Sequence, residues 1–123
     1  MMILDQLSSI VPSDRLSTHP DQLDVASRDE STLSGVTPLA VAWPLNIDEI
    51  SNIVKACAGT RTPITARGAG SALEGSTIPC PGGIVLDVSR MTRILNYWPD
   101  DLQIEIEPGI IYDHLNNRLK RDG

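Results

Sequence analysis

A glycine-rich stretch at residues 67–83 contains residue types that could bind an anion. Gly68, Gly70 and Gly75 can adopt positive φ angles, and they lack the Cβ atoms that would keep a bulky anion from the backbone. Successive amides could then converge on phosphate oxygens, with serine hydroxyls as further donors. The spacing alone leaves two interpretations equally open: a pyrophosphate cradle, or a connection that only turns between two strands.

Two well-known phosphate-binding motifs are excluded by the same stretch. A G-x-G-x-x-G dinucleotide fingerprint requires a third glycine where Leu73 stands, and the next glycine is Gly75. A P-loop requires Gly-Lys-Ser or Gly-Lys-Thr, and there is no lysine between Lys55 and Lys120. The spacing therefore points to some other phosphate-binding design.

A strand, a helix and a second strand are predicted before the glycine-rich stretch. Residues 39–43 form a short apolar run closed by a proline, which is typical of a buried strand. Asn46 and Glu49 then stand in the positions of a capping box, and apolar residues follow at helical spacing until about Gly59. Residues 63–66 are the second strand. This order predicts a right-handed crossover and parallel pairing of the two strands.

Three further strands and a helix are predicted after the stretch. They are a strand at 83–88, two strands at 93–98 and 103–107 joined by a turn at 99–101, and a helix beginning after Gly109. Alternation of isoleucine with polar residues gives the last strand one solvent-facing side. The fold class is therefore α/β, with a small mixed sheet that contains parallel strands.

The first 38 residues are predicted to be a lead-in to this unit. An amphipathic helix at residues 2–11 ends at Pro12, and a polar segment follows, with one short helical turn at 21–26. The expected division is residues 1–38 as helix and lead-in, and residues 39–123 as the α/β unit.

Composition limits the partners and the compartment. Hydrophobic residues make up 41% and charged residues 21% of the 123 residues, as in an ordinary soluble domain. A net charge of -6 with ten scattered Lys and Arg argues against nucleic-acid binding. Cys57 and Cys80 lack the spacing of a metal site, so reduced thiols, no metal and a cytoplasmic location are expected. No signal peptide or membrane span is apparent.

Five segments occur in the order found in a known family of flavoproteins. They are VAWP, IDEISNIVKAC, TPITARGAGSALEGSTIP, GGIVLDVSRMTRI and IEIEPGIIYDHLNNRL, within residues 29–123. Together they resemble the FAD-binding domain of the vanillyl-alcohol oxidase and p-cresol methylhydroxylase family. Within it, the chain is most similar to the D-lactate dehydrogenase and glycolate oxidase branch, which oxidises 2-hydroxy acids. The resemblance implies the first subdomain of the p-cresol methylhydroxylase-type FAD-binding fold.

The resemblance also implies a set of cofactor-binding residues. The glycine-rich loop would surround the FAD pyrophosphate, a proline after the first strand would lie near the nucleotide, and a Pro-Gly turn would line the cofactor. Members that attach FAD covalently through this loop carry histidine where this chain has Ser71, so non-covalent FAD is expected. The set is Pro44, Arg67, Gly68, Ala69, Gly70, Ser71, Leu73, Gly75, Ser76, Pro108 and Gly109.

No catalytic residue is expected within the chain. In the family, the domain continues with a second glycine-rich segment, and a separate substrate domain completes the active site. The resemblance thus implies an N-terminal fragment of an FAD-dependent oxidoreductase that transfers a hydride from the α carbon of a small 2-hydroxy acid to the flavin. A membrane surface or an electron acceptor would be contacted through other regions. Two alternatives remain: a non-catalytic α/β interaction module with an empty glycine loop, and a domain for another phosphorylated ligand.

A group of charged residues after the third strand has two interpretations. Asp87, Ser89, Arg90 and Arg93 could form a charged site or a solvated strand end. Glu74 lies inside the loop, where a carboxylate would repel phosphate, so its side chain is expected to point outward or to bond loop amides.

Overall fold

Two short apolar strands form the centre of a four-stranded sheet in the computed structural model, which describes residues 2–123. Strand β2 (Ala40–Ala42) lies parallel to β4 (Ile84–Asp87), and β3 (Ile64–Arg67) lies parallel to β4 on its other side. Strand β1 (Leu16–Ser17) pairs antiparallel with the outer side of β2. The predicted α/β class, with a mixed sheet containing parallel strands, is confirmed.

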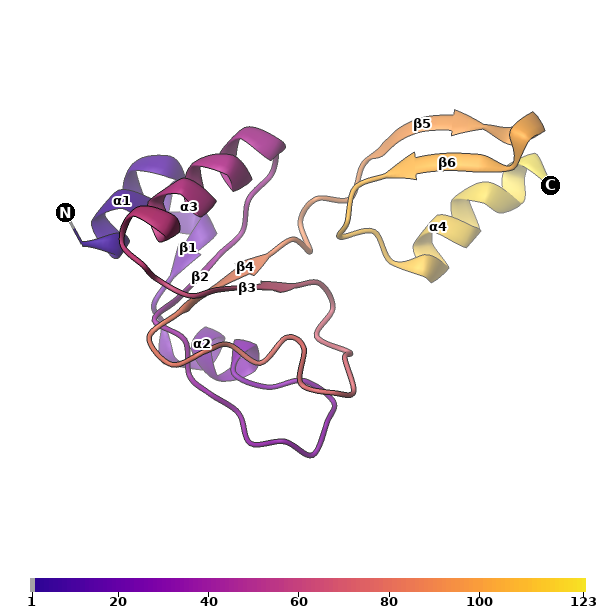
Figure 1. Ribbon diagram of the computed structural model, residues 1–123. Coiled ribbons are helices and arrows are strands. Elements are labelled where there is room, and N and C mark those ends of the chain that lie inside the picture. Colours follow the sequence, from indigo (N-terminus) through magenta and orange to yellow (C-terminus); the bar gives the residue numbers. More distant parts are fainter. Residues whose placement is uncertain (1) are drawn as a thin grey trace.

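Helices cover both faces of this sheet, as Figure 1 shows. Helices α1 (Ile3–Ile10) and α3 (Ile47–Gly59) lie on one face, and α2 (Pro20–Ala26) lies on the other. Alternate strand residues point to opposite faces, so Val41 and Val85 pack with α2, and their neighbours pack with the other two helices. The larger buried cluster contains Ile3, Leu7, Val11, Ala40, Ala42, Ile53, Cys57, Ile84 and Leu86.

The order of the strands differs from the sequence-based prediction in one respect. Strands β2 and β3 run parallel, but they do not pair with each other because β4 lies between them. Strand β4 carries the most apolar segment, and Ile84, Val85 and Leu86 are all buried, so it takes the position that is covered on both faces. Strand β3, with Ile64 exposed, takes the edge.

The first 38 residues contribute directly to the sheet and its core. Strand β1 was not predicted, because two residues are too short to show any periodicity. Helix α1 supplies Leu7, which is fully buried against α3 and the sheet. The predicted helical turn at 21–26 is the helix α2, whose first turn is capped by His19 Nδ1, accepting from the Asp21 amide at 3.3 Å.

The start of α3 is fixed by only half of the predicted capping box. Asn46 Oδ1 accepts a hydrogen bond from the Glu49 amide at 2.9 Å, as expected. The Glu49 carboxylate does not return to Asn46, because it accepts from the Leu45 amide and forms a two-point ion pair with Arg15, at 2.5 and 2.8 Å. Arg15 also donates to the carbonyl of Trp43, and so joins β1, β2 and α3.

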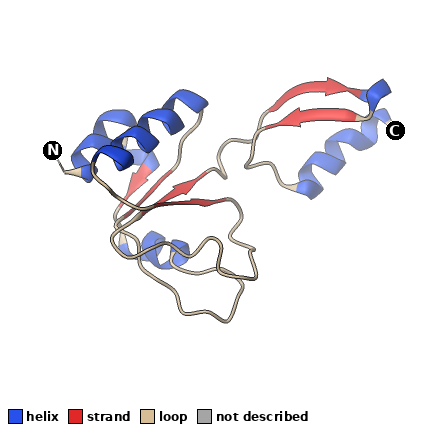
Figure 2. Cartoon of the chain, viewed as in Figure 1, coloured by secondary structure: helices blue, strands red, loops and turns tan. Residues whose placement is uncertain are grey.

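A hairpin and a final helix form a second unit beside the sheet (Figure 1). Strands β5 (Ile94–Trp98) and β6 (Gln103–Ile106) pair antiparallel across a 3-10 turn at Pro99–Asp101, and helix α4 (Tyr112–Leu119) follows. Figure 2 shows these strands in red, separate from the first sheet. All five residues of β5 are exposed, so the expected dry side of the hairpin is only partly covered within residues 2–123. No described helix is long and apolar enough to span a membrane.

The Arg15–Glu49 pair gives the first testable prediction. Glu49→Gln should lower the free energy of unfolding near neutral pH by about 2 kcal/mol, because both side chains are mostly buried and charged hydrogen bonds are lost. Arg15 holds the pKa of Glu49 below its ordinary value. The contribution of the pair is therefore complete above the ordinary carboxyl pKa and is lost as pH falls through the lowered one.

Urea unfolding near pH 7 and at about pH 3 measures this difference. Asp48→Asn is the matched control, because Asp48 is an exposed acid in the same helical turn. An Asp48 variant that loses as much stability, or a Glu49 effect that persists in acid, would contradict the prediction.

Candidate functional site

The three parallel strands end at the same edge of the sheet, and the glycine-rich loop leaves from this edge. Ala42, Leu86 and Ala66 are in register across the three strands. Beyond them, the Val88 amide donates to the Arg67 carbonyl at 2.9 Å, at the point where the loop begins. In open α/β sheets, ligands bind at the carboxyl ends of the strands. The loop therefore starts where such a fold offers a binding site.

Two of the three glycines singled out in the sequence use the positive φ that glycine permits. Gly70 and Gly75 have φ angles of 73° and 83°, whereas Gly68 does not have a positive φ. A Cβ at Gly70 would collide with the Arg67 guanidinium, and one at Gly75 would lie 2.6 Å from Leu33 Cδ1. A Cβ at Gly68 would meet no atom within 4 Å. The space beside Gly68 is thus open to a ligand.

The loop presents a row of backbone donors without partners. Among residues 2–123, none of the seven consecutive N–H groups at positions 68–74 donates a hydrogen bond, and neither do the hydroxyls of Ser71 and Ser76. The Glu74 side chain is exposed and makes no hydrogen bond to the loop amides. Consecutive free amides around glycines are the arrangement that binds phosphate oxygens. The loop can therefore hold an anion without lysine.

Arg67 supports the loop rather than reaching out of it. Its guanidinium lies beneath Gly70 and donates to the Arg28 carbonyl at 2.8 Å. The same side chain lines a hollow of about 240 Å³ together with Trp43 and Asp87. By contrast, Ala69 and Leu73 are exposed, and Leu73 retains 73% of its accessible surface. The outer residues of the loop therefore have free surface for a ligand.

The other sequence-predicted residues lie at the same edge. Pro44 follows β2 and is fully buried. Gly109 packs on the end of β4: its amide donates to the Met91 carbonyl at 2.8 Å, and a Cβ there would collide with the Val88 carbonyl. Pro108 is exposed and lines a separate hollow of about 400 Å³ with the first residues of α3. The structure thus brings the loop, Pro44 and Gly109 to one edge, with Pro108 at its margin.

Two residues at the loop were missed by the sequence reasoning. The Thr77 Oγ1 is buried and has no hydrogen-bond partner among residues 2–123. Asp29 accepts a hydrogen bond from the Gly75 amide although the two residues are far apart in sequence. Thr77 could have been noticed, because its hydroxyl stands next to Ser76 in the sequence. No sequence signal linked Asp29 to the loop.

The charged residues after β4 do not form one site. Asp87 accepts from the Ser89 amide at 2.9 Å, which closes the strand end. Arg90 lies over the Trp43 ring, 4.6 Å from its centroid, and Arg93 pairs with Glu107. Among the described residues, no group of His, Cys, Asp and Glu has an arrangement that could hold a metal ion. These charges therefore act as separate structural contacts.

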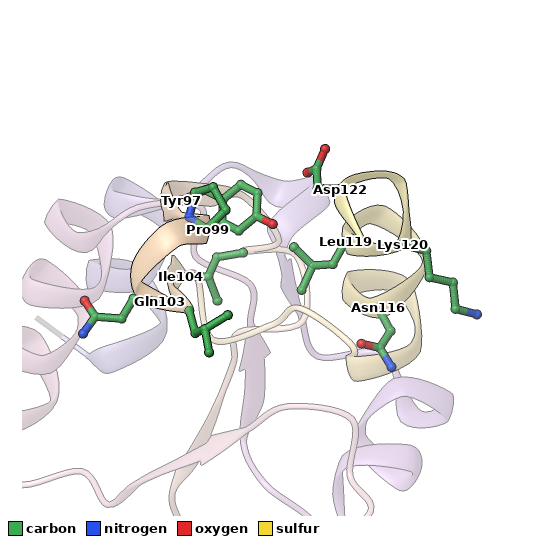
Figure 3. A pocket seen from close by; sticks show the side chains of 10 residues that line it. Tyr97, Pro99, Gln103, Ile104, Asn116, Leu119, Lys120 and Asp122 are labelled. Atoms are coloured by element: carbon green, nitrogen blue, oxygen red, sulfur yellow. The ribbon is translucent and has the colours of Figure 1, made fainter.

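A mainly apolar hollow lies in the second unit, away from the glycine-rich loop. Figure 3 shows it between the hairpin and α4, with Leu119 extending towards Tyr97 and Ile104, and Lys120 extending outward. Its volume is about 490 Å³. None of the sequence-predicted cofactor residues lines it, so it is not part of the loop site.

Residues 38–123 match the family model described as FAD binding domain. The chain belongs to this family. The match includes the glycine-rich loop and all the other residues expected to bind the cofactor. FAD is the cofactor of this family. The free amides, the open space at Gly68 and the positive φ of Gly70 have the chemistry to hold a pyrophosphate.

The relatives of this FAD-binding domain include enzymes named for 2-hydroxy acids. The chain is 29% identical to the mitochondrial D-lactate dehydrogenase [cytochrome] of Arabidopsis thaliana over 98% of this chain and 22% of that protein. It is 43% identical to glycolate oxidase subunit GlcD of Bacillus subtilis over 60% of this chain and 16% of that protein. The chain therefore spans less than a quarter of the length of these relatives.

Solved structures share the fold of the domain. The chain matches p-cresol methylhydroxylase with a TM-score of 0.86 at 17% identity, over 98% of this chain and 24% of that one. It matches the 4-ethylphenol oxidase of Gulosibacter chungangensis with a TM-score of 0.88 at 21% identity, over 98% and 24%. At these identities the likeness concerns the fold, and it confirms the p-cresol methylhydroxylase-type architecture.

Close packing of Gly109 on β4 gives a prediction for this edge of the FAD-binding domain. Gly109→Ala should lower the free energy of unfolding by about 1–3 kcal/mol, because the added methyl collides with the Val88 carbonyl and must displace the turn. Gly59→Ala is the control, because nothing lies within 4 Å of a Cβ there, and the helical alanine should be neutral or stabilising. Urea unfolding compares the two, and equal stability of both variants would contradict the packing described.

Proposed function

We propose that the chain is the FAD-binding portion of a flavin-dependent 2-hydroxy-acid dehydrogenase or oxidase of the D-lactate or glycolate type. The observation that carries the proposal is the row of seven free amides at the carboxyl edge of the sheet, in a chain that belongs to an FAD-binding family. The substrate class is supported by the names of the relatives, a D-lactate dehydrogenase and a glycolate oxidase subunit. The complete enzyme would be a longer protein, because the chain spans 22% of the plant relative.

The loop residues have distinct proposed roles. The amides of residues 68–71 would donate to the pyrophosphate oxygens, with the exposed Ser71 hydroxyl as a further donor. The positive φ of Gly70 lets the chain turn over the Arg67 guanidinium. The amide of Gly75 is already used by Asp29, so its role would be to close the loop.

Residues outside the loop would frame the cofactor. Pro44 and Gly109 are held rigidly, one buried after β2 and the other against β4, so they would limit the width of the site. Leu73, Ser76 and Pro108 would contribute exposed or half-exposed surface at its margins.

The flavin would supply the chemistry, accepting a hydride from the α carbon of the substrate. The residues of this chain would bind and orient the cofactor. We assign no catalytic acid or base to them. Attachment would be non-covalent, since Ser71 has no imidazole with which to form a bond to the flavin.

The proposal predicts the outcome of a cofactor analysis. Purified flavoprotein carrying this chain should be yellow, and acid denaturation should release intact FAD into the supernatant, identified by mass spectrometry. Addition of D-lactate or glycolate without oxygen should bleach the flavin absorbance, whereas L-lactate serves as the stereochemical control. Flavin that remains with the precipitated protein would contradict non-covalent binding. A different released ligand, or a protein with no flavin in either fraction, would contradict the function.

A second prediction concerns Gly70. Gly70→Val should abolish flavin retention, because valine at a positive φ is strained and its Cβ collides with the Arg67 guanidinium, which would displace the amides above it. The ratio of bound flavin to protein, from absorbance, is the measurement. Gly59→Val places the same side chain at an open helical position and should retain flavin. A Gly70 variant with stoichiometric flavin would disprove the loop assignment.

A further inference from the structure

One short segment, residues 28–33, contacts the glycine-rich loop at its start, middle and end. The Arg28 carbonyl accepts from Arg67 at 2.8 Å, and the Glu30 amide donates to the Ala72 carbonyl at 3.0 Å. Leu33 Cδ1 lies 2.6 Å from the position that a Cβ of Gly75 would take. Figure 2 shows the two long tan loops side by side. The loop is thus held by a segment that lies 39 to 46 residues earlier in the chain.

Asp29 is the centre of these contacts. Its Oδ1 accepts from the Ser31 amide at 2.8 Å, which closes a local turn, and its Oδ2 accepts from the Gly75 amide, also at 2.8 Å. We infer that Asp29 is a positioning residue that holds the glycine-rich loop in its ligand-ready form before the cofactor arrives. This inference rests on the proposed function of the loop as an FAD cradle.

The two hydrogen bonds also explain how a carboxylate can stand next to a phosphate-binding loop. An unpaired carboxylate facing the ligand would repel it, but both oxygens of Asp29 are engaged with amide donors. Hydrogen bonding from Ser31, followed by that from the Gly75 amide, lowers the pKa of Asp29, so the group stays ionised and a constant acceptor.

Asp29 divides the amides of the loop into two groups. The Gly75 amide is taken by the carboxylate, while those of residues 68–74 remain without partners. A bound anion would therefore meet only the first part of the loop, and the last part would serve as an anchor. Preorganised donors cost less to bring together when the ligand binds, so the anchor should raise affinity.

Asp29→Asn separates the loop contact from the local turn. Its single carbonyl oxygen can keep the bond to the Ser31 amide, but an NH₂ group then faces the Gly75 N–H, and two donors cannot bond. Asp29→Ala removes both acceptors. Asp24→Asn is the matched control: it removes one charge nearby, where Asp24 pairs only with the exposed Arg28 side chain.

The test is ¹H–¹⁵N NMR of the complete flavoprotein that carries this chain, first freed of its flavin and then titrated with FAD. In Asp29→Asn, the Gly75 amide should move upfield and the signals of residues 68–76 should broaden, while amides of β2 and β4 stay in place. FAD affinity, from the shifts of the Gly68 and Gly70 amides, should fall roughly ten- to hundredfold, which corresponds to one charged hydrogen bond. Asp24→Asn should change neither.

Several outcomes would overturn the inference. They are a wild-type Gly75 amide without the downfield shift of a carboxylate bond, an Asn variant with an unchanged loop, and an Asn variant that shifts core amides as much as loop amides. If Asp29→Ala unfolds the chain, the Asn variant and the wild-type Gly75 signal still show whether Asp29 positions the loop. A loop that depends on Asp29 while the wild type shows no FAD-induced shifts would support positioning and would overturn the proposed function instead.

Discussion

The site depends on the central position of β4. Because β4 pairs in parallel with both β2 and β3 and is buried on both faces, the three strands end in register, and their connections must leave from one edge. The glycine-rich loop and Pro44 reach this edge along the chain, and Gly109 reaches it by packing back on β4. A weaker central strand would leave these residues without a common frame.

Much of this arrangement could be predicted from the sequence, because periodicity and turn residues act over short distances. The spacing of apolar residues identified α1, α3, α4 and five of the six strands, and the motif order identified the FAD-binding family. Ser71 and Ser76 were predicted as site residues because they stand beside glycines in a recognisable loop, and the structure leaves their hydroxyls without hydrogen-bond partners among residues 2–123. Local patterns therefore identified the elements and most of the proposed site.

What could not be predicted depends on contacts between distant residues. Strand β4 lies between β2 and β3 because the most apolar strand takes the most buried position. The sequence pattern of each strand does not show which strand that will be. The Glu49 carboxylate bonds to Arg15, 34 residues away in sequence, and not to the Asn46 amide as a capping box requires. Gly68 showed the same limit: glycine permits a positive φ, but only the surrounding chain decides whether it is used.

The packing of Arg67 beneath Gly70 has an evolutionary consequence. The space that a side chain at position 70 would need is filled by the guanidinium, so a larger residue there would have to displace Arg67. Its backbone would also have to tolerate the left-handed conformation, which glycine alone adopts without strain. Related sequences should therefore keep glycine at 70 whatever residue stands at 67.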